Sequence, residues 1–170
     1  MLTIRRAEAN ELPVALNLLK DAAIWLRERQ IDYWQAWLDP PPHFVAWIQD
    51  GFDTHQFHFA CQGQDVVGCF RLQWEDELFW GAQAPVAGYV HSFTTARTLH
   101  GKRIGERILA HVEEMCRAQE KQFLRLDCGS HVAGLRRYYE AYGFQRVGET
   151  IVMNDRLTLY QKPLDQPSQI

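Results

Sequence analysis

The chain has 170 residues, of which 46% are hydrophobic and 23% are charged, and its formal net charge is −3. This length and composition are ordinary for a globular protein that buries a sizeable core. The small negative charge excludes a general attraction for nucleic acid or anionic lipid. We therefore expect one enzyme-sized domain over residues 1–162, a C-terminal tail over residues 163–170, and neither a nucleic-acid nor a membrane partner.

Neither a secretion signal nor a membrane span is predicted. The N-terminus MLTIRRAEANELP carries charges where a signal peptide needs an apolar segment, and no run of about 18 apolar residues occurs. The cysteines form no CxxC pair and share no ligand spacing with histidines, so we interpret them as reduced core thiols of a cytoplasmic protein without a bound metal. They are Cys61, Cys69, Cys116 and Cys128.

The N-terminal third is predicted to hold a strand and two helices. A strand over Leu2–Arg6 precedes a helix that is capped by Asn10 and accepts Pro13 in its first turn. The buried stripe of this helix is predicted to comprise Leu12, Leu16, Leu19, Ala23 and Leu26. The aromatic segment that follows is broken by Pro40-Pro41-Pro42, so we expect a loop and then a short helix ending near Gly51.

A β-hairpin and a further strand are predicted in the middle of the chain. Gln56–Cys61 and Asp65–Trp74 read as strands around a tight turn at Gln62-Gly63. A loop over residues 75–85 then leads to a strand that includes Tyr89–Thr95.

The stretch from Gly88 to Gly105, GYVHSFTTARTLHGKRIG, moves from a strand through a polar loop into a helix that opens at His100 and runs to about Gln119. Free N–H groups and the positive end of the helix dipole stabilise phosphate oxygens at such a helix start. Gly101 and Gly105 keep side chains away from a closely approaching ligand. Basic residues gather at this junction, which favours a small polyanion as ligand. They are Arg97, His100, Lys102, Arg103 and Arg107.

The C-terminal part is predicted to continue with a strand, a helix and two strands. Leu124–Cys128 forms the first strand, and the helix from Leu135 ends at Gly143, the residue that lets the chain turn back. Phe144–Val147 and Arg156–Gln161 supply the last two strands.

Two motifs resemble those of the GNAT superfamily of N-acetyltransferases. The hexad HGKRIG is similar to the acyl-CoA motif [QR]-x-x-G-x-[GA], with His100 and Arg103 departing from it and Gly105 matching. The departure at Arg103 is accommodated if that residue is already helical. The run from Tyr139 to Phe144 matches the family's Y-x-x-x-G-F signature, and Val132 stands where the family often has Asn.

The resemblance implies an α/β fold of the GNAT type: a central mixed, mostly antiparallel sheet with splayed middle strands, flanked by helices. It implies acetyl-CoA as cosubstrate, with the pantetheine arm paired to the backbone of Phe93–Thr95 and the pyrophosphate on the N–H groups of Gly101–Gly105. The cofactor-binding residues implied in this way are Phe93, Thr94, Thr95, His100, Gly101, Lys102, Arg103, Ile104, Gly105 and Glu106.

The family chemistry is direct attack of an amine on the thioester in a ternary complex. Tyr139 is the residue that the resemblance assigns to protonating the departing thiolate; the alternative is a core aromatic role beside Tyr138 and Tyr142. The amine must first lose a proton. Our candidates for the base are His91, on the ligand strand, and Glu75, at the end of the preceding strand, while a structural role is the alternative for His91.

The function predicted is acetylation of a primary amine of an unidentified small molecule or peptide. Aromatic residues and acidic loop residues suit a cationic amine; the acidic ones include Asp32, Glu75, Asp76 and Glu77. The alternative is a non-catalytic acyl-CoA-binding regulatory module of the same fold. Dimers are common among similar proteins, so a homodimer is one expected assembly.

Overall fold

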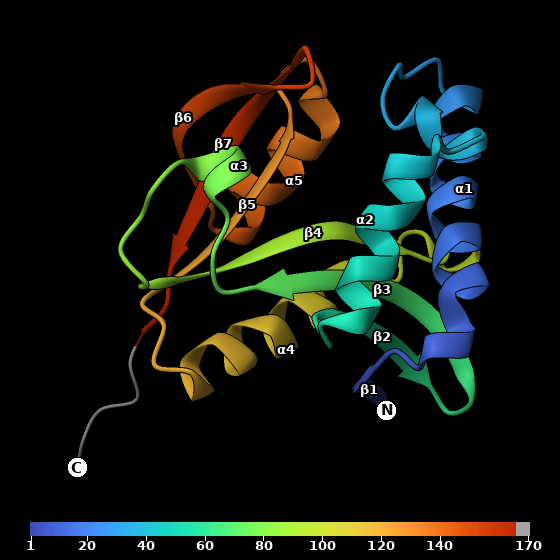
Figure 1. Cartoon of the computed structure of the whole chain (residues 1–170), viewed down its shortest axis with the longest axis horizontal. Coiled ribbons are helices and arrows are strands. Elements are labelled where there is room, and N and C mark those ends of the chain that lie inside the picture. Colours follow the sequence, from blue (N-terminus) through green and yellow to red (C-terminus); the bar gives the residue numbers. More distant parts are fainter. Residues whose placement is uncertain (166–170) are drawn as a thin grey trace. The chain divides into compact units, whose positions relative to one another are not determined.

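The computed structural model describes residues 1–165 (Figure 1). The chain divides into two compact units. The first unit comprises Met1–Leu72 and Ser92–Leu109. The second comprises Gln73–His91 and the chain from Ala110 onward. Most of the predicted tail, residues 166–170, lies outside the described residues. Each unit is considered by itself below.

The first unit contains an antiparallel sheet. Its strands are β1 (Leu2–Arg6), β2 (Phe57–Gln62) and β3 (Asp65–Gln73), and Gly63, with φ of +63°, forms the predicted turn between the last two. The second half of β4 (Ala87–Thr95) lies against β3. A Cβ at Gly68 would lie 2.9 Å from the carbonyl oxygen of Thr94, so glycine permits this close approach.

The helices α1 (Leu12–Glu28) and α2 (Pro42–Asp53) lie side by side in the first unit (Figure 1). The stripe of α1 is confirmed at Leu19, Ala23 and Leu26, which are buried. Leu19 and Ala23 pack in a core with aromatic residues of α2 and β2. Two other members of the predicted stripe are only half-buried, and three neighbours are buried in their place. The half-buried residues are Leu12 and Leu16, and the buried ones are Ala15, Leu18 and Ala22.

The predicted cap Asn10 is wrong. It lies inside a 3-10 turn, Ala9–Glu11, that precedes α1. Glu11 closes the start of this turn, because its carboxylate accepts a hydrogen bond from the backbone N–H of Glu8 at 2.8 Å. The same carboxylate pairs with Arg5 at 2.6 Å. Glu11 thus supplies one half of a capping box, in which the third residue of the turn accepts from the backbone N–H of the capping residue.

The second unit is built on strands of both directions. The first half of β4 pairs in parallel with β5 (Phe123–Gly129), from Ala87↔Phe123 to Val90↔Leu126. On its other side β5 pairs antiparallel with β7 (Asp155–Pro163), and β7 forms a hairpin with β6 (Gln145–Val152). The helix α5 (Ala133–Tyr142) ends at Gly143, whose φ of +109° confirms the predicted turn residue.

The full strand order is β1-β2-β3-β4-β5-β7-β6 in one mixed, mostly antiparallel sheet, so the predicted α/β class is confirmed. The β4–β5 register ends at Val90↔Leu126, although β4 continues to Thr95 and β5 to Gly129. The residues that follow the last parallel pair are His91 and Asp127.

Two local predictions need correction. Residues 75–85 are not all loop, because α3 (Glu77–Trp80) forms one short helical turn there. The helix α4 (Ile104–Ala118) starts at Ile104 instead of His100. Gly101 and Arg103 have φ of +80° and +56°, which no right-handed helix contains, so Arg103 is not helical. Among the described residues, the helices are too short or too polar to cross a membrane.

Candidate active site

Three ionisable side chains converge in the second unit. Asp76 precedes α3, His91 lies on β4, and Asp127 lies on β5. The His91 Nε2 atom is 2.7 Å from Asp76 Oδ2, and the Nδ1 atom of the same ring is 3.7 Å from Asp127 Oδ2. The exposed fractions of the three side chains are 2% for Asp76 and 9% for each of the other two. A buried imidazole therefore has a carboxylate beside each of its ring nitrogens.

Strand geometry explains why these groups meet. Side chains alternate between the faces of a strand, so Tyr89 and His91 of β4 share one face with Arg125 and Asp127 of β5. The polar pair Tyr89 and Arg125 lies within the parallel register, and His91 and Asp127 follow directly after it. The segment with α3 brings Asp76 to the same place.

A second polar layer fixes the α3 segment against this face. The guanidinium of Arg125 donates hydrogen bonds to Gln161 at 2.8 Å, to the hydroxyl of Tyr89 at 2.8 Å and to Gln83 at 3.2 Å. It also lies 4.9 Å from the ring centre of Trp80 on α3. Phe79, the residue before Trp80, stacks at a tilt on His91 with ring centres 4.5 Å apart. These contacts leave the imidazole little freedom to turn.

The electrostatics of the cluster favour proton exchange near neutral pH. Burial raises the pKa of Asp127 from 3.8 to about 6; His91 opposes the rise and the nearby Asp76 carboxylate adds to it. The Oδ2 atom of Asp127 is buried and accepts no hydrogen bond from the described residues. Two carboxylates beside one imidazole stabilise the imidazolium that forms when the ring takes a proton. The arrangement can therefore accept and hold protons.

A cation is the alternative occupant of the cluster, because one ligand atom from each residue lies within 4.8 Å of the others. The carboxylates, however, approach opposite nitrogens of one ring, and a single ion can bind only one of those nitrogens. The geometry fits shared protons better than one metal ion.

Of the two predicted bases, only His91 belongs to the cluster. Glu75 is exposed, and its neighbour Asp76 makes the contact with His91. The sequence analysis placed Asp76 among the acidic loop residues that suit a cationic amine, but it did not select Asp127. The available signal for Asp127 was an acidic residue within the strand FLRLDCG, since unpaired acids are rarely buried.

Tyr139, the predicted acid, is buried on α5 with 6% exposure. Its ring contacts those of Tyr138, Phe144 and Tyr160, at centre distances of 5.4, 5.7 and 6.2 Å. Such packing holds the ring in a fixed orientation and is compatible with either role proposed for Tyr139. Its role as proton donor stays a prediction.

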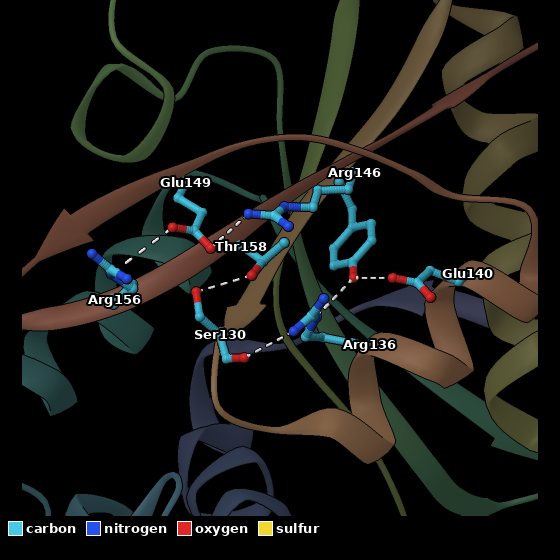
Figure 2. Close-up of polar contacts among 8 residues, drawn as sticks. Ser130, Arg136, Glu140, Arg146, Glu149, Arg156 and Thr158 are labelled. Atoms are coloured by element: carbon cyan, nitrogen blue, oxygen red, sulfur yellow. Dashed lines mark hydrogen bonds and ion pairs between the residues drawn. The ribbon is translucent and has the colours of Figure 1, made fainter.

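Polar contacts hold α5 to β7 (Figure 2). The Tyr160 hydroxyl donates to Glu140 at 2.7 Å and accepts from Arg136 at 3.4 Å. Arg136 also donates to the carbonyl oxygen of Ser130 at 3.3 Å, and the Ser130 hydroxyl pairs with that of Thr158 at 2.9 Å. Arg136 is thus more than a solvated helix residue. In the same view Glu149 lies between Arg146 and Arg156 on the β6–β7 hairpin.

The predicted cofactor residues form one stretch of the first unit. Thr94 is buried, while Phe93 and Thr95 are half-buried. The Arg97 guanidinium donates to the carbonyl oxygen and the hydroxyl of Thr95, at 2.9 and 2.8 Å, and lies 5.3 Å from the ring centre of Trp25.

The loop that follows is open. His100, Gly101, Lys102 and Arg103 are exposed and Ile104 is buried, while Gly105 and Glu106 are half-buried. Arg103 pairs with Glu106 at 2.6 Å, which ties the loop to the first turn of α4. Exposed backbone at a helix start is available to an anion.

Comparison with known proteins identifies the family. The model of the acetyltransferase (GNAT) family matches residues 14–144. The chain is 27% identical over 140 residues to the uncharacterized N-acetyltransferase YesJ of Bacillus subtilis (strain 168), with coverage of 78% of this chain and 75% of that protein.

Solved structures of acetyltransferases share the fold. A GNAT-family acetyltransferase from Listeria monocytogenes 4b F2365 matches with a TM-score of 0.78 at 23% identity, over 96% of this chain and 95% of that one. The aminoglycoside acetyltransferase AAC(6')-Ib, solved with coenzyme A and kanamycin, matches with a TM-score of 0.72 at 15% identity, over 96% and 95%. Because the family model covers most of its residues, the chain belongs to the GNAT family of acetyltransferases.

Proposed function

We propose that the protein transfers the acetyl group of acetyl-CoA to a primary amine of a small molecule or peptide, by direct attack in a ternary complex. Family membership supports acetyl transfer, and the relative YesJ is named as an N-acetyltransferase. AAC(6')-Ib, whose fold is similar, was solved with coenzyme A and an aminoglycoside. The observation that carries the proposal is the buried His91, whose Nε2 atom lies 2.7 Å from Asp76 and whose Nδ1 atom lies 3.7 Å from Asp127.

Acetyl-CoA binds, in this proposal, through the first unit. The backbone of Phe93–Thr95 pairs with the pantetheine arm, and N–H groups within Gly101–Gly105 receive the pyrophosphate. The loop carries Lys102 and Arg103 as exposed cations that balance the phosphate charge.

His91 serves as general base. Asp76 fixes the orientation of its ring and stabilises the imidazolium, a role that a carboxylate commonly plays beside a catalytic histidine. A strand N–H near Phe93 or Thr94 polarises the thioester carbonyl, and Tyr139 protonates the departing thiolate.

The test is an amine panel with acetyl-CoA, read by release of free thiol. We expect release with at least one primary amine, and we expect His91→Gln to lower kcat/KM by about 10²-fold or more, the usual range for loss of a general base. His111→Gln, on the outer part of α4, is the matched control. An active His91→Gln enzyme would show that another group takes the proton.

The non-catalytic alternative gives a different pattern. The departures at His100, Arg103 and Val132 motivate it. The left-handed Arg103 shows that the loop differs from the expected helical start. A regulatory module would bind acetyl-CoA without releasing thiol in the presence of any amine.

A further inference from the structure

We propose that Asp127 binds the ammonium group of the acceptor and takes its first proton, so that the enzyme acts on aliphatic amines, which are protonated at neutral pH. This inference rests on the proposed function and adds a catalytic residue and a substrate class to it. The observation behind it is the Oδ2 atom of Asp127, which is buried and accepts no hydrogen bond from the described residues.

A buried carboxylate oxygen without a donor is costly, and such groups in native proteins are normally satisfied by a ligand or by water. The Asp127 side chain is 9% exposed, so this oxygen is nearly shielded from bulk solvent. Its nearest ring nitrogen, His91 Nδ1, lies 3.7 Å away, beyond hydrogen-bond distance. The Oδ2 atom therefore has a hydrogen-bonding position that none of the described residues fills.

The charges around Asp127 favour a cation in that position. Asp76 and His91 face it from the α3 segment and from β4, and the adjacent Cys128 thiol stays neutral because burial raises its pKa to about 12. Arg125 lies two residues earlier on the same face, with its hydrogen bonds directed to Gln161, Gln83 and Tyr89. When both carboxylates are ionised and His91 is protonated, the three groups together carry a net charge of −1.

The proton balance of the reaction calls for two acceptors. An ammonium nitrogen carries three hydrogens, whereas the nitrogen of the product amide keeps one. Asp127 takes the first proton, and the neutral amine then forms the C–N bond to the thioester carbon. His91 takes the second proton as the C–S bond breaks.

The thiolate receives a proton from Tyr139, which is reprotonated by one of the two released protons, and the other proton passes to solvent. The sum is R–NH3⁺ plus acetyl-CoA giving the N-acetyl amine, CoA thiol and one H⁺. Two neighbouring acceptors, Asp127 and His91, match the two protons that must leave.

An NMR titration tests the ammonium site without any need for turnover. The full-length protein is labelled with ¹³C at the aspartate side-chain carboxyl carbons, and the Asp127 signal is assigned by its loss in Asp127→Asn. We expect its titration midpoint, near pH 6, to fall in n-butylammonium chloride, because a bound cation stabilises the carboxylate. n-Butanol and tetrabutylammonium chloride at the same concentration should leave the titration midpoint unchanged.

A midpoint that n-butylammonium does not move overturns the ammonium site, even if the protein acetylates some amine. A midpoint that moves equally in tetrabutylammonium, which has no N–H, also overturns it. A Zn²⁺ titration that shifts the signals of Asp127, Asp76 and His91 at micromolar metal would assign the position beside Asp127 to a metal ion and overturn the ammonium site.

Enzyme kinetics test the role of Asp127 as a proton acceptor. On the best amine from the thiol-release panel, Asp127→Asn should lower kcat/KM by about 10²-fold or more and remove the rise of kcat/KM with pH through about 6. Asp155→Asn, an exposed residue at the start of β7, should keep the wild-type profile. An Asp127→Asn enzyme with an unchanged profile would overturn the proposal, whereas a wild-type protein that releases no thiol would overturn the proposed function instead.

Discussion

Asp127 is a buried acid on β5, and its ionisation costs the fold stability. Raising its pKa from 3.8 to about 6 corresponds to about 3 kcal/mol at neutral pH, at 1.36 kcal/mol per pKa unit. Between these two pH values the native state binds a proton that the unfolded chain has released, so this group's contribution to stability falls as pH rises from 4 to 6 and stays low above it. Active-site groups often carry such a cost.

We therefore predict that Asp127→Asn unfolds at higher denaturant than the wild type at pH 7.5, by at most about 3 kcal/mol, and that the difference disappears near pH 4. Urea melts at a series of pH values measure this difference directly. The pKa of Glu11 is lowered by its hydrogen bond with Arg5, so its effect on stability has the opposite pH dependence. Because both proteins contain Glu11, this effect cancels in the difference between wild type and Asp127→Asn. A variant less stable than the wild type at pH 7.5 would contradict the prediction.

The role of Tyr139 as proton donor depends on its phenol hydroxyl. Tyr139→Phe keeps the ring and its contacts with Phe144 and Tyr160 while it removes the proposed proton donor. Turnover should fall by about 10²–10⁴-fold with little change in acetyl-CoA affinity, and the fall should shrink with acyl donors whose thiol leaves easily. Tyr142→Phe, on the same helix, is the control. Near-normal turnover in assays limited by chemistry would return Tyr139 to a core role.

Among the elements, the junction before α4 is built on backbone conformations that L-residues avoid. Gly101 adopts φ of +80° without strain, whereas Arg103 adopts φ of +56° at a cost. The side chain of Arg103 pairs with Glu106 and is otherwise exposed, so the pairing contributes little. The helix consequently begins only at Ile104.

This conformation predicts an unusual ranking of two variants. Arg103→Gly and Arg103→Ala both remove the ion pair, but only glycine adopts a left-handed backbone freely. The glycine variant should therefore be more stable than the alanine variant by about 1 kcal/mol, the reverse of the order inside a helix. Unfolding of the two variants in guanidinium chloride measures this difference in stability. An alanine variant of equal or higher stability would mean that residue 103 is right-handed in solution.

For the whole molecule, ligand binding should appear as added stability. If acetyl-CoA binds the native state alone, a concentration of 100 times Kd adds about 2.7 kcal/mol. For a chain of this size that raises Tm by roughly 5–10 °C. Differential scanning fluorimetry with acetyl-CoA at millimolar concentration measures the shift.

Gly105→Val provides the matched variant, because a bulky residue there should weaken phosphate binding more than folding. Its Tm without ligand should stay near the wild-type value, while most of the acetyl-CoA shift is lost. A wild-type melt that acetyl-CoA leaves unchanged, together with silent calorimetry, would remove the basis of the proposed function.

The sequence alone determined the local structure and the family. Strand alternation and turn glycines predicted β2, β3 and their hairpin within a residue, and the Y-x-x-x-G-F run with Gly143 identified α5 and its end. These features depend on residues that are close along the chain, where propensity and periodicity act. The same information selected His91 as a base.

Only the tertiary structure decided which groups accompany His91. The parallel register of β4 and β5 brings Asp127 beside it, and the turn before α3 places Asp76, not Glu75, on its other nitrogen. Pairing between strands that are distant in sequence is not encoded in the periodicity of either strand. The pKa of Asp127 likewise follows from burial by residues remote in the chain, and no local pattern specifies that burial.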